Sequence, residues 1–112
     1  MAVRTLAKAY AAFSLADENT LAAVEQAGQE ALGHETSWAF LEGDTLRISW
    51  EGLYFPLEDV LSALAATLGS GSAGKLDYLD LEEWTLTRYV PGTNGFQASK
   101  RDLNQVLDYS GH

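Results

Sequence analysis

The chain has 112 residues, with 16 Asp and Glu against 7 Lys and Arg, so its formal net charge is −9. This acidic excess argues against nucleic acid and anionic membranes as partners, because both attract Lys and Arg. The sequence contains no cysteine, which excludes disulfides and thiolate metal sites, and its two histidines are His34 and His112. We therefore expect neither a metal nor a cofactor.

The length and the apolar content predict a single soluble domain over residues 1–112. Hydrophobic residues make up 46% of the chain and aromatic residues 11%, which is enough to build a core. No apolar run approaches the ~20 residues that span a bilayer. The first ten residues do not have the pattern of an export signal, so we expect a cytoplasmic protein without membrane contact.

The first third of the chain is typical of helices. Its apolar residues recur every three or four positions, which predicts a helix over residues 3–15. These residues are Val3, Leu6, Tyr10 and Phe13. A second helix is expected to follow a cap at Asn19 or Thr20 and to run to Leu32, with Gly33 as a left-handed stop. The two stretches would form an antiparallel pair or one long bent helix.

The apolar period then changes to two residues, which indicates strands. Residues 37–41 and 45–50 alternate in this way, and Gly43 lies first in the two-residue loop between them, as a type II′ hairpin requires. Residues 53–55 are an optional third strand. Pro56 opens a helix whose leucines keep helical spacing to Leu68, and a flexible loop follows over residues 70–74.

The last third predicts a second hairpin and a final helix. Residues 76–79 are expected to pair with residues 84–90, and a turn-rich loop follows at residues 91–95. Ser99 is expected to cap the final helix. The inward residues of that helix would be Leu103, Val106 and Leu107. We also expect at least two of the three tryptophans to be largely buried, and these are Trp38, Trp50 and Trp84.

These elements predict an α+β domain in the order α-α-β-β-(β)-α-β-β-α. Its antiparallel sheet would have three to five strands, with two N-terminal helices, one central helix and one C-terminal helix packed mainly on one face. Such a sheet leaves its other face open or covers it with a second subunit, so a homodimer is one expectation. From its second helix onward, the expected element order resembles that of the compact acidic chaperones of type III secretion, which have one leading helix where two are expected here.

The acidic excess is concentrated in residues 34–74, which carry a net charge of −5. The carboxylates of this segment could gather at one end of the sheet, where they would attract a basic protein. The candidate partner-binding residues are Glu42, Asp44, Glu51, Glu58 and Asp59. The same residue types also suit a hairpin tip and the first turn of a helix.

Two further groups of charged residues occur near the C-terminus. The acids are Asp77, Asp80, Glu82 and Glu83, and the bases are Arg88, Lys100 and Arg101. Carboxylates bind hard cations, but the glycine and the closing glutamate of a calcium loop are missing here, which favours a solvated turn. The bases are expected to offset nearby carboxylates.

The sequence therefore favours a non-enzymatic protein–protein interaction module, such as an adaptor, a chaperone-like protein or an inhibitor of the immunity type. The alternative is a small enzyme or ligand-binding domain with a pocket between sheet and helices. The residues of that pocket would be His34, Glu51, Tyr54 and Arg88. No nucleotide-binding or nucleophile motif occurs in the sequence, which favours the first hypothesis.

Overall fold

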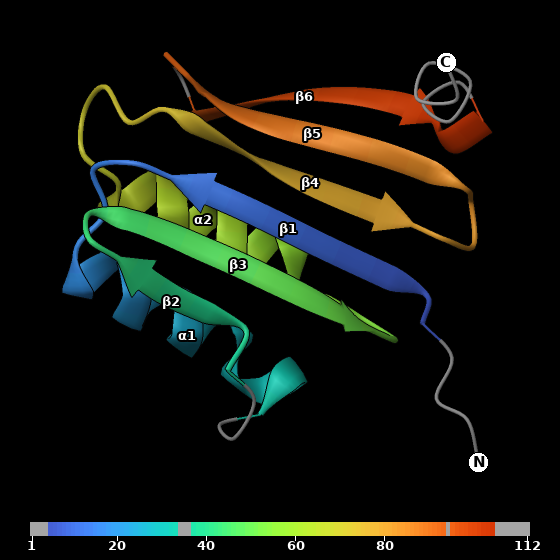
Figure 1. Cartoon of the computed structure of the whole chain (residues 1–112), viewed down its shortest axis with the longest axis horizontal. Coiled ribbons are helices and arrows are strands. Elements are labelled where there is room, and N and C mark those ends of the chain that lie inside the picture. The colour runs from blue at the N-terminus through green and yellow to red at the C-terminus, as the bar shows by residue number, and fades with distance from the viewer. Residues whose placement is uncertain (1–4, 34–36, 94, 105–112) are drawn as a thin grey trace.

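The computed structural model describes residues 5–33, 37–93 and 95–104. Its helices are α1 (Glu18–Leu32) and α2 (Leu57–Thr67), and its strands are β1 (Ala7–Phe13), β2 (Ala39–Glu42), β3 (Thr45–Gly52), β4 (Gly74–Asp80), β5 (Thr85–Gly92) and β6 (Gly95–Asp102). The strands form one antiparallel sheet in the order β2-β3-β1-β4-β5-β6. Both helices lie against the same face of this sheet, and the other face is open (Figure 1).

The first predicted helix is wrong, because residues 7–13 form the strand β1 in the middle of the sheet. β1 pairs with β3 on one side and with β4 on the other. Its sequence also fits a period of two, since Ala9 and Phe13 are buried under the helices while Lys8 and Tyr10 lie on the open face. Alanine favours helices, but pairing with two strands outweighs that local preference.

The last predicted helix is wrong over residues 99–102, which belong to β6. Ser99 pairs with Arg88 of β5 and does not cap a helix. Leu103 is buried, as expected, and Val106 and Leu107 lie outside the described residues. The long pairing with β5 decides the conformation here, because the sequence of β6 is too polar to favour either structure by its own pattern.

The predicted third strand at residues 53–55 does not form. β3 extends to Gly52, and the chain then turns so that the carbonyl of Tyr54 accepts a hydrogen bond from Nε1 of Trp50 at 2.9 Å. The described elements therefore follow the order β-α-β-β-α-β-β-β, with two helices and six strands. This order differs from the one that carried the resemblance to type III secretion chaperones.

The predictions for α1, α2 and the two hairpins are confirmed, with small shifts. Asp17 caps α1 in place of Asn19 or Thr20, since its carboxylate accepts the N–H of Thr20 at 3.0 Å. Gly43 has a φ angle of 65°, as a type II′ turn requires. Gly33 ends α1 with a positive φ of 79°, but its ψ of 173° differs from the left-handed helical conformation that was expected.

One core fills the space between the helices and the covered face of the sheet. Its fully buried large side chains come from both layers: Phe13, Val24, Leu46, Phe55, Val60, Leu64 and Leu76. Trp38 is buried among them and meets Phe55 edge-on, with 5.8 Å between ring centroids. Trp50 is only partly buried and Trp84 is exposed, so the expected burial holds for one tryptophan alone. Neither α1 nor α2 has the length and apolar content to cross a membrane.

A substitution at Gly28 tests how closely α1 packs against the core. A Cβ atom at residue 28 would collide with Cζ2 of the buried Trp38 ring. We expect Gly28→Ala to lower the free energy of unfolding by about 1–2 kcal/mol, because overpacking outweighs the gain in helix propensity. Urea unfolding measures this change, with Glu25→Ala on the exposed side of α1 as the control. A more stable Gly28→Ala variant would contradict the contact, since helix propensity alone predicts that sign.

Candidate functional site

One row of backbone pairs brings five strand ends together. Gly52 pairs with Ala7, Ala7 with Asp80, Asp80 with Thr85, and Thr85 with Asp102. Figure 1 accordingly places the tips of β3, β4 and β6 at the same end of the sheet as the first residues of β1 and β5. At about 4.8 Å per strand, the row spans about 19 Å from β3 to β6.

The segments that leave this row carry exposed apolar side chains among carboxylates. Leu53 and Tyr54 follow β3 and are 59% and 61% exposed, and Trp84 precedes β5 and is 41% exposed. The carboxylates come from the end of β3, the first turn of α2 and the β4–β5 turn. We call this group the aromatic–acidic end, and it comprises Glu51, Leu53, Tyr54, Glu58, Asp59, Asp80, Glu82, Glu83 and Trp84.

Trp84 has an unusual backbone conformation for a large residue. Its φ angle is 60°, in the left-handed region that costs a non-glycine residue about 1–2 kcal/mol. Its carbonyl accepts the N–H of Leu103 at 2.9 Å, and its Nε1 donates to Oδ1 of Asn104 at 3.0 Å. These bonds hold an exposed indole in one orientation outside the core.

Tyrosines extend the aromatic–acidic end onto the covered face of β4 and β5. Burial raises the pKa of Tyr78, and the negative charge of Asp80 and the nearby Tyr54 act in the same direction. Burial also raises the pKa of Tyr89, with a further contribution from Glu58 of α2. Tyr54 and Glu58 therefore interact electrostatically with tyrosines on the covered face of the sheet.

The five carboxylates predicted to bind a partner do not share one face. Glu42 and Asp44 lie at the β2–β3 hairpin, whereas Glu51 lies at the opposite end of β3, about 20 Å away at 3.3 Å per residue. Glu58 and Asp59 occupy the first turn of α2, which begins at the same end of the sheet as Glu51. The aromatic–acidic end therefore retains three of the five predicted residues.

The carboxylates considered as cation ligands are separated. Asp77 lies on the open face, where Arg88 donates to both of its oxygens at 2.7 and 3.0 Å. Oδ1 of Asp80 accepts the N–H groups of Glu82 and Glu83 at 3.0 and 3.1 Å, which closes the β4–β5 turn. Over residues 5–33, 37–93 and 95–104, no three metal-ligating side chains are grouped.

The residues of the alternative catalytic pocket are scattered. Glu51 and Arg88 both lie on the open face, but β1 and β4 separate their strands by about 14 Å. Tyr54 lies beyond the end of β3, and His34 lies outside the described residues. These positions do not form a catalytic constellation, because the groups must lie within hydrogen-bond reach of one substrate.

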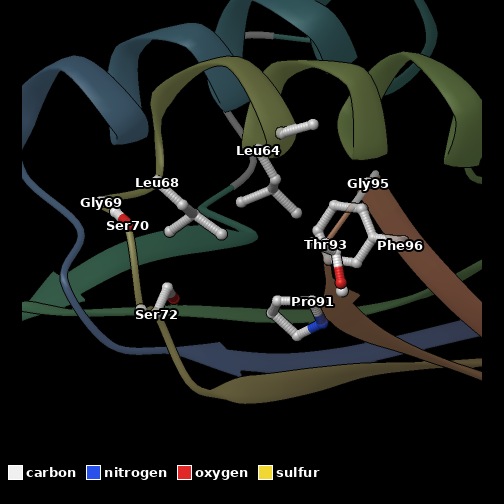
Figure 2. A pocket seen from close by; sticks show the side chains of 12 residues that line it. Leu64, Leu68, Gly69, Ser70, Ser72, Pro91, Thr93, Gly95 and Phe96 are labelled. Atoms are coloured by element: carbon white, nitrogen blue, oxygen red, sulfur yellow. The ribbon is translucent and has the colours of Figure 1, made fainter.

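A cavity of about 660 Å³ lies at the other end of the sheet. Its walls are the end of α2, the loop that follows and the β5–β6 hairpin (Figure 2). Figure 2 shows Leu64 and Leu68 on one side of the cavity, with Pro91, Thr93 and Phe96 on the other. The described residues that line it are apolar or neutral, so it offers packing contacts but no acid–base pair.

Comparison with models of protein families, with curated proteins and with solved structures gives no match. The candidate site therefore rests on its own geometry. Sequence reasoning named Glu51, Tyr54, Glu58 and Asp59 but missed Leu53 and Trp84. The row that joins these residues exists only because β1 is a strand, so no local sequence signal could have grouped them.

Glu51 is the carboxylate of the aromatic–acidic end whose ionisation can be tested directly. Nζ of Lys8 lies 3.0 Å from its Oε1, across the β1–β3 pair. The hydrogen bond from Lys8 lowers the pKa of Glu51 from its ordinary value of 4.5, and Tyr10 adds a second bond. The same interaction raises the pKa of Lys8.

We expect a carboxyl-carbon NMR titration to give Glu51 a pKa below 4.5, which moves back toward 4.5 in Lys8→Met. Because the folded-state pKa is lowered, the pair stabilises the protein above the unfolded-state pKa, and this contribution is lost as the pH falls through the folded-state pKa. Lys100→Met removes an equal charge beside Glu83 and should leave Glu51 unchanged. An equal response to both variants would contradict a local pair.

Proposed function

We propose that this protein is a non-enzymatic interaction module, of the adaptor or inhibitor kind, that binds a basic partner protein through its aromatic–acidic end. One observation carries this proposal: Leu53, Tyr54 and Trp84 are exposed among six carboxylates at one end of the sheet. Aromatic rings attract Lys and Arg through their faces, and carboxylates form charge-assisted hydrogen bonds with the same groups. A surface that combines both is complementary to a basic protein.

The distribution of charge over the fold supports a basic partner. Neither α1 nor α2 contains Lys or Arg, although both carry acids in their first turns. Most described bases project from the open face of the sheet, and these are Lys8, Arg47, Lys75, Arg88 and Arg101. Lys100 lies on the covered side and pairs with Glu83 at 3.4 Å. A basic partner that approaches the aromatic–acidic end is therefore attracted at long range.

The residue types at this end suit a protein interface better than a reaction site. Exposed Tyr and Trp supply much of the binding energy in interfaces, and surrounding charges set specificity and association rate. The fixed orientation of Trp84 lowers the entropy that binding would cost. The homodimer and the cytoplasmic location expected from the sequence remain predictions.

A synthetic peptide of alternating Arg and Leu provides a basic probe, with an alternating Glu and Leu peptide for comparison. We expect the protein to bind the Arg peptide in calorimetry, with an affinity that falls as salt is added. Replacing Tyr54 and Trp84 together by Ala should weaken binding by about tenfold or more, because two cation–ring contacts are lost. If the protein fails to bind the Arg peptide at low salt, the proposal that its partner is basic is wrong.

A charge-matched pair of variants separates the site from the net charge. Glu58→Gln with Asp59→Asn removes two charges in the first turn of α2, and Glu18→Gln with Glu25→Gln removes two charges on α1. The first pair should weaken binding of the Arg peptide, and the second should change it by less than about twofold. Equal losses would show that only net charge matters and would reject the aromatic–acidic end as the site.

A further inference from the structure

The open face of the sheet carries a depression of about 420 Å³ over β2, β3, β1 and β4. Its floor includes the small residues Ala12 and Ser49. Phe40 and Tyr10 also line it, and they are 43% and 38% exposed. The depression therefore offers two aromatic side chains around a floor that small side chains leave accessible.

Two cationic side chains flank this floor. Ala12 pairs with Arg47 on one side and with Lys75 on the other, so their Cα atoms lie two strand spacings, or about 10 Å, apart. Both side chains are long enough to reach an anion placed above Ala12. Arg47 and Lys75 therefore make a locally positive site in a protein whose net charge is −9.

The carboxylates near the depression leave this positive charge available. Arg47 uses Nε to bind Oε1 of Glu42 at 3.0 Å, which engages one of its three nitrogens. Asp77 lies 3.9 Å from Nζ of Lys75, but Arg88 already holds both oxygens of that carboxylate at 2.7 and 3.0 Å. Asp77, which also lines the depression, is thus shared between Arg88 and Lys75. Three cations, Arg47, Lys75 and Arg88, therefore face only the two carboxylates of Glu42 and Asp77, which leaves one positive charge in excess.

We propose that this depression binds a monocarboxylate with an apolar aromatic body. The carboxylate lies above Ala12 between Arg47 and Lys75, and the body packs against Phe40 and Tyr10. The planar fork of an Arg side chain matches the two oxygens of a carboxylate, and a Lys adds a point charge. A free aromatic acid has this chemistry, and so does a C-terminal phenylalanine of a peptide.

The test compares 3-phenylpropionate with 3-phenylpropionamide, which has the same body without the charge. In a titration followed by amide NMR, the acid should shift the signals of Ala12, Arg47 and Lys75, and the amide should bind at least about tenfold more weakly. Equal binding of the two compounds, or shifts confined to other parts of the sheet, would overturn the proposal.

Variants then assign the two cations. Lys75→Gln should weaken binding of the acid by about tenfold, and Arg47→Lys should weaken it less, since it keeps the charge but loses the planar fork. Lys100→Gln removes a base from the other side of the sheet and should leave the affinity unchanged. Thermal unfolding of each variant checks that the fold is retained. Equal losses in Lys75→Gln and Lys100→Gln would reject the site.

A tripeptide that ends in Phe, tested with a free and with an amidated C-terminus, distinguishes the two sources of the ligand. Tighter binding of the free-acid peptide than of 3-phenylpropionate, lost on amidation, identifies a protein C-terminus. Tighter binding of 3-phenylpropionate identifies a small molecule. If neither the peptide nor 3-phenylpropionate gives saturable binding at this face, the proposal is wrong.

Discussion

The position of β1 between β3 and β4 is the constraint on which the rest of the structure depends. β1 is the first strand in the chain, yet β3 and β4 flank it in the sheet, so the first half of the fold is joined to the second through it. The small inward residues Ala7 and Ala9 let the layers approach closely, and Phe13 fills the core. The same strand fixes the row from Gly52 to Asp102 that assembles the aromatic–acidic end.

The charged residues of this protein are grouped by the face and the end of the sheet on which they lie. Their order along the sequence does not reveal this grouping. The segment with the largest acidic excess divides between the two ends of β3, so Glu42 and Glu51 serve different surroundings. On the open face, bases pair across strands with single carboxylates, as Lys8 does with Glu51 and Arg88 with Asp77. The helices carry acids without bases, which leaves the acidic excess on the covered side and at the ends.

The parts of the fold that the sequence predicts are those with local causes. The Asp17 cap and helical spacing define α1, Pro56 and helical spacing define α2, and Gly43 defines the β2–β3 turn. β1 was missed because its partners β3 and β4 are distant in sequence and its own residues also fit helical spacing. β6 was missed for another reason: it pairs with the adjacent strand β5, but its polar sequence favours neither a helix nor a strand. The candidate site was missed in the same way, since Trp84 joins Tyr54 only after β1 has aligned β3 with β4 and β5.

Nuclear Overhauser contacts around Tyr10 test the central strand most directly. We expect cross-strand contacts from Tyr10 to Ser49 and to Asp77, together with slow amide exchange throughout residues 7–13. The local sequence pattern predicts the opposite, with contacts between residues three apart and no contact to either strand. Helical contacts over residues 7–13 would contradict the fold and, with it, both surfaces that depend on β1.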